Sequence, residues 1–322
     1  MIITRTPFRI SFAGGGTDFR DFYETERGAV VSTAIDKYMY IIVNKRFENS
    51  IRISYSKTEI VDNVEQISHP IVREALKLTG IDGRIEIASM ADIPAGTGLG
   101  SSSSFTVGLL NALYAYKGIK KDIEEIVREA CYIEIDILGE PIGIQDQYIT
   151  GYGGFRFFQF NIDGSVYTEQ VLNQNKQQIA NNLMLFYTGD ARGAKSILGE
   201  QKANMKQSDK FAFLRQMRDM ALSMRSQLNN GTSPDILGDY LHRGWLLKKK
   251  LASGISNSKI DKYYEKALEA GALGGKILGA GGGGFLLFYC REEKQNQVKD
   301  ALSDITWKQF SFEAEGSKII HI

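Results

Sequence analysis

A glycine- and serine-rich segment, residues 94–104 with the sequence PAGTGLGSSSS, restricts the fold of this chain more than any other feature. It follows a stretch in which Ile85 and Ile87 alternate with polar residues, which indicates a half-buried strand. It precedes an apolar stripe at helical spacing that begins at Phe105. The glycines allow unusual backbone dihedrals and close approach. The segment therefore predicts a strand, a glycine loop and the N-terminus of a helix.

The chemistry of this loop points to a polyphosphate ligand. The first amides of a helix lack internal partners, and with the positive end of the macrodipole they form an anion site. No lysine follows the glycines, so the loop is not a Walker A motif, and Ser101 stands where a dinucleotide fingerprint needs its third glycine. On composition alone, a flexible turn with a serine N-cap fits the same residues.

The pattern Pro-x-Gly-x-Gly-Leu-Gly-Ser-Ser resembles the phosphate-binding motif of the GHMP kinases, a family that includes galactokinase, homoserine kinase, mevalonate kinase and phosphomevalonate kinase. The resemblance implies that ATP binds here and that the second serine, Ser102, helps to bind Mg²⁺. The residues implied to contact ATP are Gly96, Thr97, Gly98, Leu99, Gly100, Ser101, Ser102 and Ser103.

A second motif, residues 5–18 with the sequence RTPFRISFAGGGTD, reads as a strand that runs into a glycine turn and a carboxylate. Taken alone, Asp18 could cap a helix that begins at Phe19. The segment resembles the N-terminal motif of the same family. The resemblance implies that Arg9 lies near the phosphoryl acceptor as a catalytic residue and that Asp18 accepts hydrogen bonds from substrate hydroxyls.

The glycines of this motif bear on the substrate. Gly15 and Gly16 replace the Glu-His pair of galactokinase, and the form Gly-Gly-Gly-Thr-Asp resembles the heptose 7-phosphate kinase branch of the family. Fucokinase-like proteins have a related Gly-Gly pattern. The resemblance implies that Gly15, Gly16 and Thr17 belong to the substrate site.

A third glycine segment, residues 276–284 with the sequence KILGAGGGG, contains a literal G-x-G-x-x-G. A dinucleotide fingerprint must open a helix, whereas residues 285–289 are typical of a strand. The segment resembles the third GHMP motif, a loop that closes over the active site, which implies that Gly281 and Gly282 contact substrate. A plain hairpin turn is the other interpretation.

Two carboxylates follow the serine-rich helix. Glu134 lies on a predicted helix over residues 122–138, and Asp146 lies in a loop after Pro141. The resemblance implies that Glu134 binds Mg²⁺ and that Asp146 is the catalytic base. The spacing is one residue longer than in mevalonate kinase, so Asp136 and Glu140 are alternatives to Glu134. Without the resemblance, Glu134 fits a solvated helix face.

A phosphorylated substrate needs a cationic pocket. Arg192 follows a short apolar strand in the glycine-containing segment Thr-Gly-Asp-Ala-Arg. An arginine fork suits a phosphate in a bidentate contact, so Arg192 is the first candidate for the phosphate of a sugar phosphate. The weaker candidates lie on predicted strands, where cationic side chains usually face solvent: Lys45, Arg46, Arg52 and Lys57.

The organisation of the chain predicts an α+β fold. At roughly 100–200 residues per domain, 322 residues indicate two domains, with a boundary in the polar stretch around 173–182. We expect an N-terminal domain over 1–178 and a C-terminal domain over 179–322 whose closing strands lie at 307–312 and 319–322. The resemblance implies a ribosomal-protein-like first domain, a ferredoxin-like second domain, and ATP between them.

The net charge, the apolar runs and the cysteines of the chain limit which kinds of partner it can have. The formal net charge of +1 gives no basic field for nucleic acid. No apolar run approaches the roughly 20 residues that cross a bilayer, and residues 1–7 lack the apolar core of a signal peptide. The cysteines, Cys131 and Cys290, form no C-x-x-C pair and suit a reducing compartment. We expect a cytoplasmic protein that acts on a small molecule, and we make no prediction of its oligomeric state.

Three functions compete. The first is ATP- and Mg²⁺-dependent phosphorylation of the anomeric hydroxyl of a sugar phosphate, with D-glycero-D-manno-heptose 7-phosphate preferred and its 1,7-bisphosphate as product. The second is a GHMP kinase for another acceptor, such as fucose, galactose or an isoprenoid precursor. The third is a non-catalytic nucleotide-binding regulator on the same fold. The presence of both Ser102 and Asp146 argues against the third.

Overall fold

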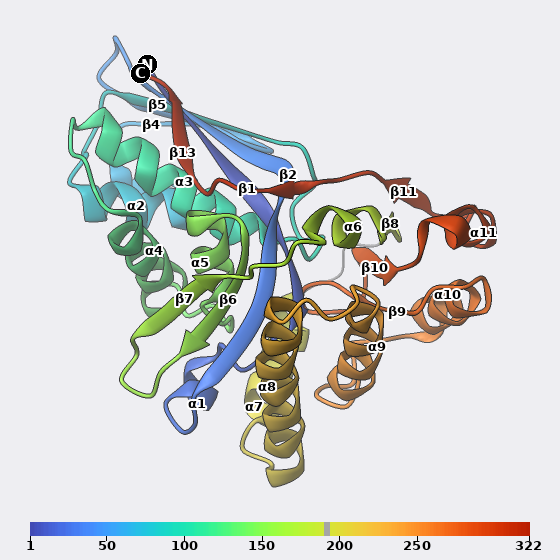
Figure 1. Ribbon diagram of the computed structural model, residues 1–322. Helices are drawn as coiled ribbons and strands as arrows, with labels where there is room; N and C mark the ends of the chain where they lie inside the picture. Colours follow the sequence, from blue (N-terminus) through green and yellow to red (C-terminus); the bar gives the residue numbers. More distant parts are fainter. Residues whose placement is uncertain (190–193) are drawn as a thin grey trace.

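The structure is a computed structural model that describes residues 1–189 and 194–322. Within these residues the strands form two separate sheets, one of nine strands and one of four (Figure 1). The nine-stranded sheet has the order β13-β1-β2-β5-β3-β4, with β6 and β12 also paired to β2 and β7 paired to β6. The predicted two-domain α+β fold is confirmed.

The first sheet is built on one long antiparallel pair. β1 (Ile2–Ala13) and the 18-residue β2 (Gly28–Lys45) run beside each other from Ile2 opposite Val43 to Ala13 opposite Val31. β-Branched and aromatic residues dominate β2, as such strands favour. The remaining strands of this part are β3 (Ile51–Ser54), β4 (Thr58–Val61), β5 (Ile85–Ala91), β6 (Phe155–Phe160) and β7 (Val166–Gln170).

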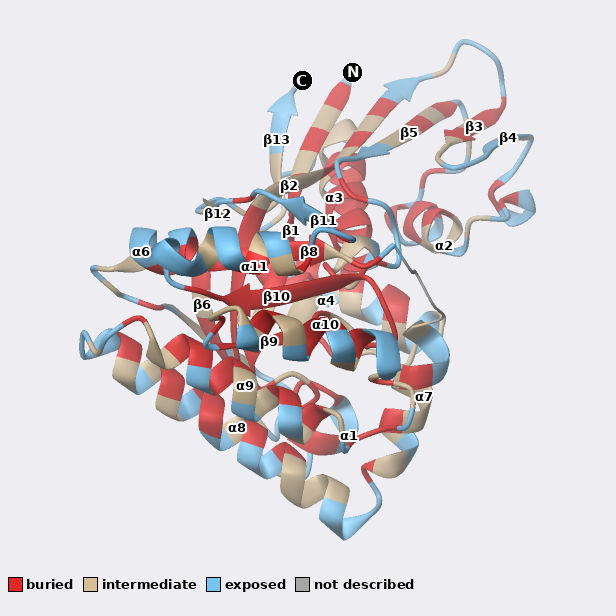
Figure 2. Cartoon of the chain, turned by 90° about the vertical axis from the view of Figure 1, so that its right-hand side faces the viewer, coloured by how far each residue is buried: buried red, intermediate tan, exposed pale blue. Residues whose placement is uncertain are grey.

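One helix lies at the centre of the first domain. α3 (Ser101–Tyr116) is apolar on nearly all sides, because β1 and β2 cover one face and helices cover the others. Figure 2 shows it almost entirely buried. The helices of this part are α1 (Arg20–Tyr23), η1 (Val64–Gln66), α2 (Pro70–Thr79), α4 (Ile123–Cys131), the π-helix η2 (Tyr132–Ile137) and α5 (Gln145–Tyr152).

The second sheet is antiparallel, with the order β11-β8-β10-β9. Every residue of β10 is buried, because helices and the first domain cover both faces (Figure 2). The strands are β8 (Leu183–Tyr187), β9 (Gly274–Ile277), β10 (Phe285–Tyr289) and β11 (Thr306–Lys308). The helices are α6 (Lys176–Asn181), α7 (Ala194–Asn204), α8 (Ser208–Asn229), α9 (Ile236–Lys248), α10 (Ser258–Glu269), η3 (Glu292–Lys294) and α11 (Gln295–Ala301).

After the second sheet the chain returns to the first. β12 (Phe312–Glu313) pairs with β2, and β13 (Lys318–His321) pairs with β1, where His321 lies opposite Ile3. Figure 1 accordingly shows the two termini side by side. The prediction that residues 319–322 close the second domain is wrong, because strand partnership depends on distant residues that a local pattern does not reveal. The boundary at 178/179 stays a prediction.

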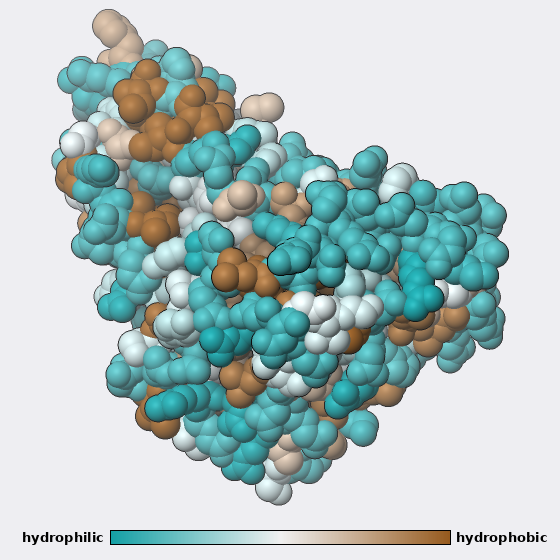
Figure 3. Space-filling view, viewed as in Figure 1, coloured by the Kyte–Doolittle hydropathy of each residue, from teal (hydrophilic) through white to brown (hydrophobic). Residues whose placement is uncertain are grey.

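The surface is mainly hydrophilic on the face shown in Figure 3. Apolar groups gather near the end where β13 lies, and the exposed apolar side chains of that strand are Ile319 and Ile320. Among the helices of the described residues, none combines the length and the apolar character that a membrane crossing requires.

Candidate active site

The guanidinium of Arg9, on β1, and the carboxylate of Asp146, in the first turn of α5, form a two-bond ion pair. Arg9 donates from Nε to Oδ1 and from Nη2 to Oδ2 of Asp146, each at 2.6 Å. Nη1 of Arg9 donates to the carbonyl of Gly98 at 2.5 Å. The first and second motifs and the predicted base are thus brought together, although 137 positions separate the two partners of the ion pair.

The glycine loop and the C-terminal glycine segment are in direct contact. Gly98 has φ +88°, and a Cβ there would lie 2.5 Å from the carbonyl oxygen of Leu278. A Cβ on Gly279 would lie 2.4 Å from Cα of Gly98. Because real Cβ atoms do not approach so closely, each glycine makes room for the other loop. The loop then enters α3 through Gly100, the N-cap residue with φ +77°.

Glu134 lies under this loop and is fully buried. Ser102 Oγ donates to its Oε1, and Gln147 Nε2 donates to its Oε2 at 2.7 Å. Burial raises the pKa of Glu134 to about 7, with a smaller contribution from the negative charge of Asp146. The interpretation of Glu134 as a solvated helix face is wrong, because η2 turns this residue inward.

The two alternatives to Glu134 each pair with a cationic side chain. Asp136 accepts hydrogen bonds from Arg20 at 2.7 and 3.2 Å, and Glu140 accepts one from Lys195 at 2.8 Å, both at the surface. The element η2 is a π-helix. A π-helix accommodates an extra residue within a helix and is frequent at functional sites. This fits the one-residue difference in spacing seen in the sequence.

Asp18 is a buried carboxylate rather than a helix cap. Its Oδ1 accepts from the amide of Gly16 at 2.8 Å and its Oδ2 from the amide of Gln145 at 3.3 Å, whereas the N-cap of α1 is Phe19. Burial, and to a smaller extent the nearby charge of Asp146, raises the pKa of Asp18 to about 6. A Cβ on Gly143 would lie 2.0 Å from Oδ2 of Asp18, so a glycine there is needed for this approach.

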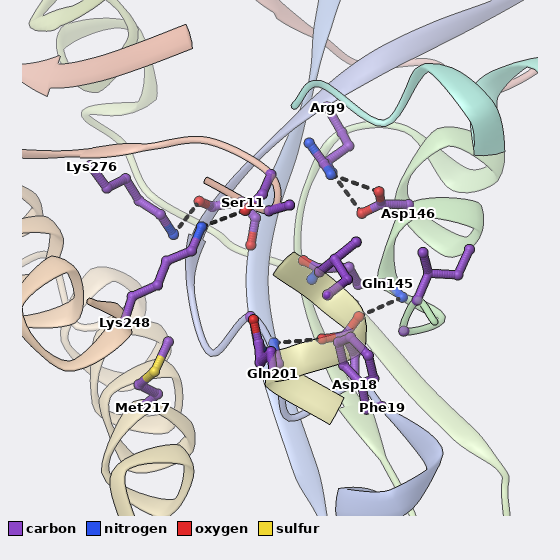
Figure 4. A pocket seen from close by; sticks show the side chains of 17 residues that line it. Arg9, Ser11, Asp18, Phe19, Gln145, Asp146, Gln201, Met217, Lys248 and Lys276 are labelled. Carbon is purple, nitrogen blue, oxygen red and sulfur yellow. Dashed lines mark hydrogen bonds and ion pairs between the residues drawn. The ribbon is translucent and has the colours of Figure 1, made fainter. Parts of the chain in front are cut away.

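A cavity of about 90 Å³ lies between Asp18, Asp146 and the second domain (Figure 4). Two of its polar atoms, Ser11 Oγ and Gln145 Oε1, are buried and have no hydrogen-bond partner among the described residues. Such orphaned atoms point to a ligand that supplies donors and acceptors. The other lining residues include Gly15, Gly16, Phe19, Ile142, Gln201 and Met217.

Two buried lysines from the second domain, which were not among the predicted site residues, line the same cavity. Lys248 ends α9, and Lys276 lies on β9. Burial lowers the pKa of Lys276 to about 8 and that of Lys248 well below its ordinary value, with a further contribution from neighbouring cations. A signal was available, because Lys248 continues the apolar stripe of α9 after Leu241 and Trp245.

A larger cavity of about 970 Å³ runs from Asp146 and Glu134 along the glycine loop. Its lining includes aromatic rings: those of His69 and Phe105 stack at 4.9 Å between centroids, and Tyr55 meets His69 edge-on at 4.8 Å. Ser101, Ser102 and Ser103 line the same cavity. A cavity of this size, lined by hydroxyls of the glycine loop and by aromatic rings, matches the chemistry of a nucleotide.

Some predicted site residues lie elsewhere. Thr17 is buried behind the cavity, where its Oγ1 donates to the carbonyl of Gly14 at 2.8 Å and accepts from the amide of Ala29 at 3.0 Å. Gly281 lines the larger cavity, whereas Gly282 donates from its amide to the carbonyl of Ile255 at 3.0 Å and packs against α7. Arg192 lies outside the described residues.

Comparison with known families fits this geometry. Residues 56–154 match the model of the GHMP kinases N terminal domain, and residues 224–309 match the model of the GHMP kinases C terminal domain. The chain belongs to the GHMP kinase family. It is therefore an enzyme that transfers a phosphoryl group from ATP to an alcohol, as the sequence motifs predicted.

Individual GHMP kinases resemble the chain along its length. It is 29% identical over 345 aligned residues to D-glycero-alpha-D-manno-heptose 7-phosphate kinase of Campylobacter jejuni, covering 98% of both chains. It is 25% identical to a bifunctional fucokinase/GDP-fucose pyrophosphorylase of Arabidopsis thaliana, covering 92% of this chain and 31% of that one. A solved D-glycero-D-manno-heptose 1-phosphate kinase from Bacteroides thetaiotaomicron has the same fold, with a TM-score of 0.81, 21% identity, and coverage of 100% and 99% of the two chains.

Proposed function

We propose that this GHMP kinase transfers the γ-phosphoryl group of ATP to the anomeric hydroxyl of D-glycero-D-manno-heptose 7-phosphate, giving the 1,7-bisphosphate. The observation that carries the proposal is that Arg9 and Asp146 line both cavities. A nucleotide in the larger cavity and a sugar in the smaller one would meet at this pair. The similarity to the Campylobacter heptose kinase supports the choice of acceptor.

Asp146 would act on the acceptor. Its carboxylate orients the anomeric hydroxyl and takes its proton as the hydroxyl oxygen bonds to the γ-phosphorus, while the bond from that phosphorus to the bridging oxygen breaks and ADP leaves. Arg9 supplies positive charge and N–H donors where the negative charge develops. The two-bond contact with Arg9 also fixes the direction of the Asp146 carboxylate.

ATP, the phosphoryl donor, and its metal ion would be held by residues 96–103 and Glu134. The free amides at the start of α3 suit the phosphates of ATP. The Ser102 hydroxyl and the Glu134 carboxylate meet at one point, and they fit Mg²⁺, which usually binds one or two carboxylates together with phosphates and water. The bound ion would neutralise phosphate charge. Tyr55, His69 and Phe105 would receive the base.

Sugar recognition would come from Asp18, Ser11 and Gln145. Asp18 offers an acceptor for two hydroxyls, and Ser11 Oγ and Gln145 Oε1 have unused hydrogen-bonding capacity. Gly15 and Gly16 keep that wall free of side chains. These groups are uncharged apart from Asp18, so a neutral sugar such as fucose is the second candidate, supported by the similarity to the Arabidopsis fucokinase.

The third function weighed from the sequence, a non-catalytic nucleotide-binding regulator, does not account for an acceptor cavity beside an ion-paired carboxylate. We propose a cytoplasmic enzyme with a small-molecule acceptor and no nucleic acid partner, in keeping with its net charge of +1.

The test is ADP release, measured by a coupled assay with Mg·ATP and a panel of acceptors: the heptose 7-phosphate, mannose 6-phosphate, fucose, galactose and mevalonate. We expect turnover with the heptose phosphate and weak turnover with mannose 6-phosphate. Turnover of a neutral sugar alone would replace the proposed acceptor, and ATP binding without any turnover would favour the regulator.

A further inference from the structure

Lys248 and Lys276 approach the smaller cavity from the side opposite Asp146 (Figure 4). Both are buried, with exposed fractions of 8% and 6%. Lys276 Nζ donates to the carbonyls of Ser11 and Phe12 at 3.0 and 3.4 Å. Lys248 Nζ donates to the carbonyl of Ile277 at 3.3 Å and to that of Gly279. Across residues 1–189 and 194–322, no carboxylate forms an ion pair with either lysine.

This arrangement is unusual because buried ammonium groups are normally paired with an anion. The nearest other cation, Arg9, already has its counter-ion in Asp146. Each lysine has three N–H donors and uses two of them on carbonyls, which leaves one on each for a further acceptor. Two cations on adjacent elements that lack an anion and face a cavity form a site that is incomplete without an anionic ligand.

The position of the lysines decides which anion they serve. Both line the smaller cavity, and neither lines the larger one, where the glycine loop, Ser102 and Glu134 lie. The two cavities join where Ile142, Leu198 and Gly279 line both. The lysines therefore belong to the acceptor side and not to the phosphates of ATP.

We propose that Lys248 and Lys276 bind the phosphate of the acceptor that is not transferred, and so select phosphorylated sugars over neutral ones. The proposal rests on the proposed function, since it assigns a part of the same acceptor site. It places the phosphate on α9 and β9, apart from the groups that contact the reacting hydroxyl. Lys248 and Lys276 are in this sense specificity residues, and Asp146 and Arg9 are the catalytic ones.

The same arrangement couples phosphate binding to proton uptake. Burial and nearby cations lower the pKa of Lys276 to about 8 and also lower that of Lys248, so Lys276 is partly neutral in the empty site near pH 8. A phosphate dianion beside the amines would raise both pKa values again. Binding of a sugar phosphate then takes protons from the buffer, whereas binding of a neutral sugar does not.

The experiment combines kinetics with calorimetry on the full chain. For Lys248→Met we expect the KM for the heptose 7-phosphate to rise about 30-fold or more, as for the loss of one partner of a buried charge pair. We expect kcat, the KM for ATP and any turnover of the non-phosphorylated sugar to change little. Lys249→Met is the matched control, because that neighbour pairs with Asp261 at the surface and should leave the KM unchanged.

Calorimetry needs no variant and stays informative if Lys248→Met does not fold. Mannose 6-phosphate is titrated into the wild-type enzyme at pH 8 in two buffers that differ in ionisation enthalpy, and mannose serves as the neutral probe. Proton uptake with the phosphate sugar alone supports the site. Binding of mannose 6-phosphate without uptake, or an equal loss of turnover of phosphorylated and neutral sugars in Lys248→Met, would overturn it. If the wild type turns over the heptose phosphate in either of those cases, the proposed function stands and only the lysine site is lost.

Discussion

The side chains of Arg9 and Asp146 meet in a pair of 2.6 Å hydrogen bonds, and only 6% and 23% of their respective surfaces are exposed. This pair stands where the two cavities join, so its removal should affect the chemical step more than nucleotide binding. For Asp146→Asn we expect kcat to fall by about 10²–10⁴-fold while the KM for ATP stays within a few-fold. The coupled ADP assay measures both.

Asp136→Asn is the control for this prediction. It removes a carboxylate of the same charge from η2, but one that pairs with Arg20 at the surface. Full activity in that variant and unchanged turnover in Asp146→Asn would together remove Asp146 from the catalytic role.

The stability of the enzyme without Mg²⁺ should fall as pH rises. Burial raises the pKa of Glu134 to about 7 from an ordinary 4.5, so the protonated form is the one the fold favours. Its stabilising effect is complete below about pH 4.5 and is lost as pH rises through about 7. In Glu134→Gln we expect a melting temperature that depends less on pH over this range and exceeds the wild-type value at pH 8. An identical pH profile in the two proteins would contradict the assignment, and Glu48→Gln, at an exposed site, serves as the control.

Glu134 should also control the need for magnesium. The ionised carboxylate is the form that binds the ion, so Mg²⁺ should raise the melting temperature of the wild type more at pH 8 than at pH 6. Glu134→Gln should lose this effect and raise the Mg²⁺ concentration for half-maximal activity by more than about tenfold, since even indirect partners of a metal site have effects of that size. Equal Mg²⁺ responses in both proteins would rule out Glu134 as a ligand.

The contact between the glycine loops can be tested with two alanines. Gly98 and Gly96 both have positive φ, so alanine carries a similar backbone cost of roughly 1–2 kcal/mol at each. Only at Gly98 would the new Cβ also meet Leu278, whereas nothing lies within 4 Å at Gly96. We expect Gly98→Ala to lower the melting temperature several degrees more than Gly96→Ala. Equal melting temperatures would mean that the two loops are not held in this contact.

The aromatic residues that line the larger cavity should determine nucleotide affinity. Tyr55→Ala removes a ring that packs edge-on against His69, and we expect the KM for ATP to rise about tenfold with kcat nearly unchanged, which is about 1.4 kcal/mol of contact. Fluorescence titration with a nucleotide checks the affinity directly. Tyr167→Ala, at an exposed position on β7, is the comparison, and an equal effect in both variants would exclude Tyr55 from the base site.

Local chemistry explains which parts of the site the sequence could predict. The glycine loop combines backbone freedom with a helix start, and both are properties of adjacent residues, so the loop could be proposed as a phosphate site from its residues. Arg9 and Asp146 entered through motifs of the same kind. Their contact across the sheet and α5 could be inferred only from a family resemblance, because no local rule pairs residues that far apart.

The lysines show where local reasoning ends. Lys248 continues the apolar stripe of α9, but it also opens a run of three lysines, which is typical of a solvated surface, and the packing of α9 against β9 buries the first of them. Asp18 also fitted a helix cap by residue preference. Its real partners are the amides of Gly16 and Gln145, and the second of these comes from α5, more than a hundred positions away.

The pairing of β13 with β1 has a consequence for the order of events during synthesis. Residues 2–13 carry Arg9 and Ser11, and the outer edge of their strand at Ile3–Arg5 pairs with residues 318–321. Everything from β8 to β11 is thus an insertion within one sheet, and Lys248 and Lys276 belong to that insertion. A ribosome releases these parts in sequence, so a nascent chain holds Arg9 long before the sheet that contains it is complete. The proposed acceptor site, which combines Arg9 with these lysines, is therefore complete only after nearly the entire polypeptide has emerged.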